Sequence, residues 1–83
     1  MKKNTLKEGY QLMIKWNEYR LSQNRQSLDK LVKLIPKLKE EAQADPVYQA
    51  DIDDLLSLKM IYETGIRGFE SKIEKYTELI DEI

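Results

Sequence analysis

The segment "QADPVY", residues 43–48, separates two halves of the chain that share one hydrophobic period. Asp45 is a residue type that caps the first turn of helices through its side-chain oxygen. Pro46 follows at a position where helices tolerate proline, because the first helical N–H has no partner inside the helix. We therefore predict a tight turn at about residues 43–46 and a helix that begins at about residue 46.

Each half repeats apolar residues at alternating spacings of four and three, which is the heptad period of a helix that packs along one partner. We call the two sets of positions the core stripes. In the first half they are Tyr10, Ile14, Asn17, Leu21, Asn24, Leu28, Leu31, Ile35, Leu38 and Ala42, and in the second Tyr48, Ile52, Leu55, Lys59, Tyr62, Ile66, Phe69, Ile73, Tyr76, Ile80 and Ile83. We predict helices at about 5–43 and 46–82. Because a short connection makes successive helices antiparallel neighbours, the expected fold is a single all-α domain, 1–83, built as a long coiled-coil-like hairpin.

The register of the hairpin follows from pairing the two stripes outward from the turn. Eight layers then align without a skip, from Leu38 with Ile52 to Ile14 with Tyr76. This register also predicts a salt bridge between Arg25 and Glu63. Residues 1–45 carry ten basic and six acidic side chains, net +4, and residues 46–83 carry four and nine, net −5, so the two helices attract each other.

Pro36 interrupts the first helix pattern, since an internal proline removes a hydrogen bond and clashes with the preceding turn at a cost of about 3 kcal/mol. The apolar period nevertheless continues on both sides of it. We expect a kink at Pro36. A complete break, which would give a three-helix chain, is the alternative.

Asn17 and Asn24 are polar members of the first stripe, opposite Ile73 and Ile66, and burial of an unbonded amide costs roughly 1–3 kcal/mol. Our first interpretation is that they determine oligomer specificity: two hairpins form a four-helix bundle in which asparagines of both copies meet and fix the register. In a second interpretation this end of the hairpin is hydrated. A ligand-binding role is the weakest of the three, because the sequence shows no other polar residues converging on them.

Leu12, Trp16 and Tyr19 form a further apolar stripe, here called the outer stripe, on the opposite side of the first helix from Ile14 and Leu21. A single hairpin leaves it in water. It is either the interface of a dimer, since 83 residues bury little surface alone, or a hot spot for another protein. In the second helix, Gly65 and Gly68 indicate close approach of another helix or local flexibility.

The composition excludes several chemistries. The chain has no cysteine and no histidine, which removes disulfides, thiol or imidazole catalysis and the usual zinc and iron sites. The acidic run Asp51, Asp53 and Asp54 falls on solvent-facing heptad positions, which argues against the alternative of a carboxylate-based magnesium-dependent hydrolase. We predict no catalytic residues, no metal site and no cofactor.

Charge and hydropathy limit the classes of partner that the sequence predicts. The net charge is −1, no apolar run reaches membrane-spanning length, and the first residues lack the apolar core of a signal peptide, so we expect a cytoplasmic protein without a membrane partner. The lysines of the first helix leave nucleic-acid association as an alternative, which the acidic second helix opposes. In composition the chain resembles small helical regulators, inhibitors and assembly factors of bacteria and phages. We therefore predict a homodimeric, non-enzymatic module that binds another protein.

Overall fold

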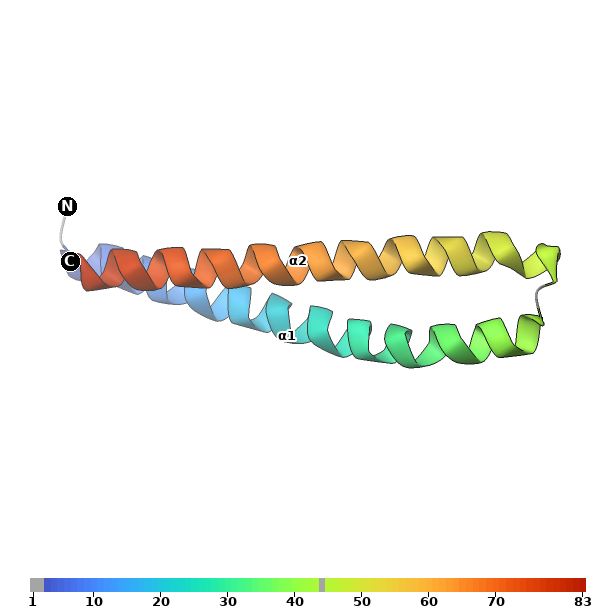
Figure 1. Cartoon of the computed structure of the whole chain (residues 1–83). Coiled ribbons are helices and arrows are strands. Elements are labelled where there is room, and N and C mark those ends of the chain that lie inside the picture. Colours follow the sequence, from blue (N-terminus) through green and yellow to red (C-terminus); the bar gives the residue numbers. More distant parts are fainter. Residues whose placement is uncertain (1–2, 44) are drawn as a thin grey trace.

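The computed structural model describes residues 3–43 and 45–83, and its fold is a hairpin of two long helices. Helix α1 spans Lys3–Ala42, and α2 spans Gln49–Asp81 after a short 3-10 turn, η1, at Pro46–Tyr48. Figure 1 shows the two helices antiparallel, with the end of α2 beside the start of α1. The molecule measures 62 × 15 × 14 Å. The predicted all-α antiparallel hairpin is confirmed.

The connection between the helices follows from its capping residues. Gln43 ends α1 with a φ of 48°, the left-handed conformation that often terminates helices. The Asp45 carboxylate accepts a hydrogen bond from the Val47 backbone N–H at 3.0 Å, and Pro46 begins η1. The predicted turn, about 43–46, includes Ala44, which lies outside the described residues. Because this first turn is 3-10, α2 itself begins at Gln49, later than predicted.

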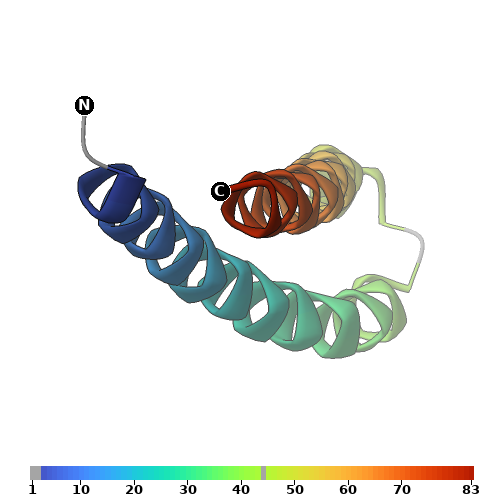
Figure 2. The same cartoon turned by 90° about the vertical axis from the view of Figure 1, so that its left-hand side faces the viewer.

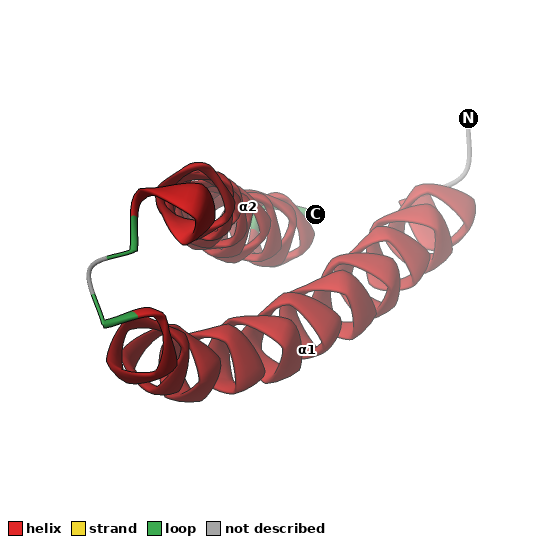
Figure 3. Cartoon of the chain, turned by 90° about the vertical axis from the view of Figure 1, so that its right-hand side faces the viewer, coloured by secondary structure: helices red, strands yellow, loops and turns green. Residues whose placement is uncertain are grey.

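Pro36 lies inside α1, and the helix continues through it to Ala42. The alternative of a three-helix chain broken at Pro36 is therefore not the fold. Pro36 and Val32 are both exposed, so the turn that lacks the proline N–H lies on the solvent side of the helix. Figures 2 and 3 show that α1 curves along its length around the straighter α2.

The core is a single thin seam between the helices. All of its buried apolar residues belong to the predicted core stripes, which confirms the heptad interpretation; they are Leu21, Leu31, Ile35, Ala42 and Ile52. Most other stripe residues are half-buried. Two helices alone cannot enclose a wider core, and much apolar side-chain surface therefore stays in contact with solvent.

Contacts across the seam fix the register. The Tyr10 and Tyr76 rings lie 5.6 Å apart, and the Arg20 guanidinium lies 5.8 Å from the centre of the Phe69 ring. Arg25 pairs with Glu70 at 3.8 Å, so the prediction of Glu63 was wrong. The register sets only the level of the backbone, whereas the long Arg25 side chain extends along α2 to a carboxylate further from the turn.

Candidate functional site

The outer stripe forms a continuous exposed surface on α1. The exposed fractions are 67% for Leu12, 56% for Trp16 and 55% for Tyr19. The Trp16 and Tyr19 rings lie 6.0 Å apart at an interplanar angle of 37°, within the range at which aromatic pairs attract each other. The aromatic part of this surface is thus already assembled in the single chain.

The Tyr19 hydroxyl lies at the end of a chain of side-chain hydrogen bonds along α1. Gln23 Nε2 donates to the Tyr19 hydroxyl at 2.8 Å, and Arg20 Nη1 donates to Gln23 Oε1 at 3.1 Å. The Arg20 guanidinium in turn lies over Phe69 of α2. The outer stripe is therefore linked to the second helix. Arg20 and Gln23 were not among the predicted site residues, although their three- and four-residue spacings, which bring side chains together on a helix, were a usable signal.

Asn17 is the most deeply buried polar residue described, with 1% of its surface exposed. Its Nδ2 donates to the Met13 carbonyl at 2.7 Å, one turn back in the same helix. We expected a partner from outside the helix, and for this nitrogen the expectation was wrong, because an asparagine side chain can reach a carbonyl of its own helix. Its role in oligomer specificity stays a prediction.

Asn24 packs against Gly65 of α2. An added Cβ at Gly65 would clash with Nδ2 of Asn24, the end of a flexible side chain, so in this arrangement the Asn24 amide occupies the space that a side chain at position 65 would take. An added Cβ at Gly68 would meet nothing within 4 Å. The close approach that we inferred from the glycines thus occurs at Gly65, within the hairpin itself.

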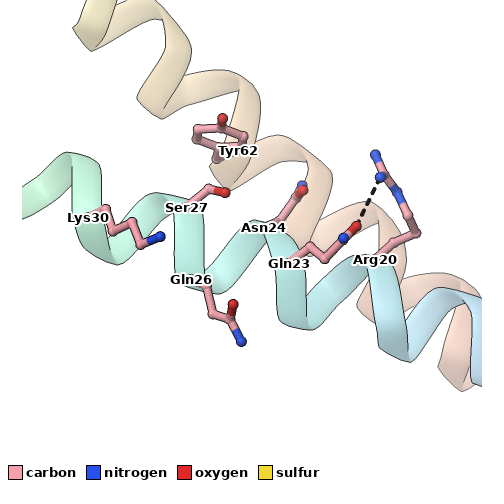
Figure 4. A pocket seen from close by; sticks show the side chains of 7 residues that line it. All are labelled: Arg20, Gln23, Asn24, Gln26, Ser27, Lys30 and Tyr62. Atoms are coloured by element: carbon pink, nitrogen blue, oxygen red, sulfur yellow. Dashed lines mark hydrogen bonds between the residues drawn. The ribbon is translucent and has the colours of Figure 1, made fainter.

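A polar hollow of about 400 Å³ lies beside Asn24 (Figure 4). Every lining side chain can form hydrogen bonds, two are cationic and none is acidic; they are Arg20, Gln23, Asn24, Gln26, Ser27, Lys30 and Tyr62. The expectation that no polar set gathers near the asparagines was wrong. Successive turns of α1 supply six of these residues, and only the pairing of the helices adds Tyr62.

The acidic residues offer no comparable site. Among the residues the structure describes, no group of three or more His, Cys, Asp or Glu side chains is placed to hold a metal ion. Over the same residues, neither α1 nor α2 contains a stretch that is long and apolar enough to cross a membrane. The predicted site residues fall into two places, with Leu12, Trp16 and Tyr19 exposed on α1 and Asn17 and Asn24 against α2.

The chain matches no protein-family model, no curated protein and no solved structure. Its function is therefore inferred from its own surface. The features that stand out there are the outer stripe, with its aromatic pair, and the large area that two helices leave uncovered.

Proposed function

We propose that this chain is a non-enzymatic protein–protein interaction module that forms a homodimer and binds another protein through the outer stripe. One observation carries the proposal: the Trp16–Tyr19 pair is more than half exposed, and the Tyr19 hydroxyl accepts a hydrogen bond from Gln23, which in turn accepts one from Arg20. Trp and Tyr are the side chains that most often dominate binding energy at protein interfaces. Such a module would act as a regulator, an inhibitor or an assembly factor.

Preorganisation favours the outer stripe as a binding surface. Ordering a mobile side chain on association costs about 0.5–1.5 kcal/mol, and this cost falls when the side chain is already fixed. Gln23 donates a hydrogen bond to Tyr19, and Trp16 packs against Tyr19, so both contacts restrict the two rings. A partner that covers the stripe therefore gains the burial of two aromatic rings with little loss of side-chain entropy.

The homodimer is supported by the surface area of the chain. Its accessible surface is 6505 Å², about 1,300 Å² more than the roughly 5,200 Å² of a compact protein of 9.9 kDa. Its radius of gyration is 18.7 Å, against about 12 Å for a compact domain of this length. A second hairpin that covers one side would remove much of this excess and widen the core into a four-helix bundle.

The partner-binding part is tested by comparing the wild type, Trp16→Ala and Tyr48→Ala as immobilised baits. Tyr48 is another exposed aromatic residue, far from the outer stripe at the turn, and serves as the matched control. A protein retained by the wild type is identified by mass spectrometry, purified and titrated against each variant. We expect Trp16→Ala to weaken its affinity at least about 30-fold, equivalent to about 2 kcal/mol, and Tyr48→Ala to leave it unchanged.

Circular dichroism and light scattering accompany the titration. Trp16→Ala should retain the helicity and the mass of the wild type. Unfolding of Trp16→Ala would show that Trp16 stabilises the fold instead, and equal affinity of all three baits would place the binding surface elsewhere.

A further inference from the structure

The outer stripe continues along α1 into polar and cationic residues. Beyond Tyr19 the same alternation of four and three reaches Gln23, Gln26 and Lys30, so these residues lie on the same side of the helix as the stripe. All three line the polar hollow beside Asn24 (Figure 4). A partner that lies along this side of α1 and covers the outer stripe therefore meets the hollow next.

The hollow presents positive charge that the hairpin does not neutralise. Its two cations are Arg20 and Lys30, and no acidic side chain lines it. Asp29 is next to Lys30 in the sequence, but its carboxylate lies 2.9 Å from the Lys33 ammonium instead. Arg20 donates to the neutral Gln23. Across the described part of the chain, neither cation of the hollow forms an ion pair, so each can pair with an anion from outside.

The geometry of the hollow suits carboxylates. Its two cations stand at opposite ends of the lining residues in Figure 4, and their backbone positions are about 15 Å apart along α1 at about 1.5 Å per residue. Arg20 is half-buried, with its guanidinium 5.8 Å from the centre of the Phe69 ring, which restricts it. Between the cations lie groups that can donate hydrogen bonds, from Asn24, Ser27 and Tyr62. A segment with two or more carboxylates can reach both ends.

Helix α2 adds a positive charge beside the hollow. Lys72 is exposed and lies one heptad after Gly65, so both are on the same side of α2. Gly65 contacts Asn24, which lines the hollow. The local charge on this side is therefore positive, although the net charge of the chain is −1.

We propose that the hollow binds carboxylate side chains of the protein that covers the outer stripe. The inference rests on the proposed function and deepens it by naming the chemistry of the partner. Its binding segment carries apolar residues that pack on Trp16 and Tyr19, followed by Asp or Glu residues that pair with Arg20 and Lys30. Residues 46–83 have a net charge of −5, so a long polyanion such as a nucleic acid would be repelled beyond the hollow, whereas a short acidic segment is not.

The first test uses a capped hexaglutamate peptide as the probe. It is titrated at low salt into isotope-labelled protein, and binding is followed by the NMR shifts of the backbone amides. The variants are Lys30→Gln and Lys37→Gln. Both lysines are exposed, so neither replacement disturbs the seam. Lys37 is the matched control because it lies one heptad after Lys30, on the same side of α1, and does not line the hollow.

We expect the largest shifts at residues 20–30 and around Tyr62. The dissociation constant should rise about threefold to fivefold in Lys30→Gln, as for the loss of one exposed ion pair, and stay unchanged in Lys37→Gln. Equal affinities of the two variants would overturn the inference, because they would show diffuse attraction by the lysines of α1. Sodium phosphate at the same ionic strength is a further arm, and phosphate that binds the hollow as tightly as hexaglutamate would overturn the assignment to protein carboxylates.

The second test uses the protein captured through the outer stripe. Lys30→Gln should weaken its affinity at least about threefold, and Lys37→Gln should not. A partner that loses affinity for Trp16→Ala but not for Lys30→Gln would overturn this inference and leave the proposed function standing. A partner that loses affinity for Lys30→Gln but not for Trp16→Ala would overturn the role of the outer stripe and leave the hollow as the site that binds acidic residues.

Discussion

Gly65 lies where the Asn24 side chain of α1 packs against α2. Its missing side chain makes room for Asn24. We predict that Gly65→Ala is less stable than Gly9→Ala, because the Asn24 amide must turn away from the added Cβ, whereas Gly9→Ala leaves the free energy of unfolding unchanged or raises it by up to about 1 kcal/mol. Urea unfolding followed by circular dichroism at one fixed chain concentration measures both.

A double variant isolates the contact. Asn24→Ala removes the side chain that an alanine at position 65 would strike, so Gly65→Ala should be better tolerated in the Asn24→Ala background than in the wild type. Equal stability of Gly65→Ala and Gly9→Ala would show that the close approach at Gly65 is dispensable.

A substitution at Asn17 should affect the free energy of unfolding and the oligomeric state in different ways. Its amide nitrogen is satisfied by the Met13 carbonyl, but an apolar side chain at this buried position needs no such bond. We predict that Asn17→Leu raises the free energy of unfolding by about 1 kcal/mol while it broadens the mass distribution, because a buried polar residue restricts oligomer state at a cost in stability. Light scattering and urea unfolding provide the two readouts. A single dimeric mass in Asn17→Leu would contradict the specificity role.

At the scale of the elements, Pro36 is the main conflict between local sequence and fold. Helix α1 passes through it because the core stripe on both sides packs on α2. We predict that Pro36→Ala stabilises the protein by up to about 3 kcal/mol, since the alanine N–H restores the bond to the Val32 carbonyl. Thermal unfolding of Pro36→Ala beside Pro46→Ala measures this, because Pro46 occupies a first-turn position where its absence changes little. A lower melting temperature for Pro36→Ala would assign the proline a structural role.

Some features of the two helices could be predicted from the sequence, and others could not. The heptad period and the Asp45–Pro46 cap predicted both helices, their antiparallel order and the buried residues, because these depend on spacing along the chain. Arg25 forms its ion pair with Glu70 and not with Glu63, and Asn17 donates to a carbonyl of its own helix. Neither partner could be predicted, because a flexible side chain has several acceptors within its reach. The polar hollow escaped prediction since its members come from several turns of α1 and from Tyr62 across the seam.

At the scale of the whole molecule, a rod of 62 × 15 × 14 Å has too little interior to cover its apolar side chains. Trp16 is the only tryptophan, so its fluorescence reports on the outer stripe alone. We predict that its emission maximum stays constant when the protein is diluted through the dissociation of the dimer, and shifts to shorter wavelength when a bound partner excludes water from the ring. The measurement pairs fluorescence with light scattering at each concentration. A red shift that follows the loss of dimer mass would place Trp16 in the interface between copies, and the outer stripe would then be part of the four-helix bundle instead of the surface that binds another protein.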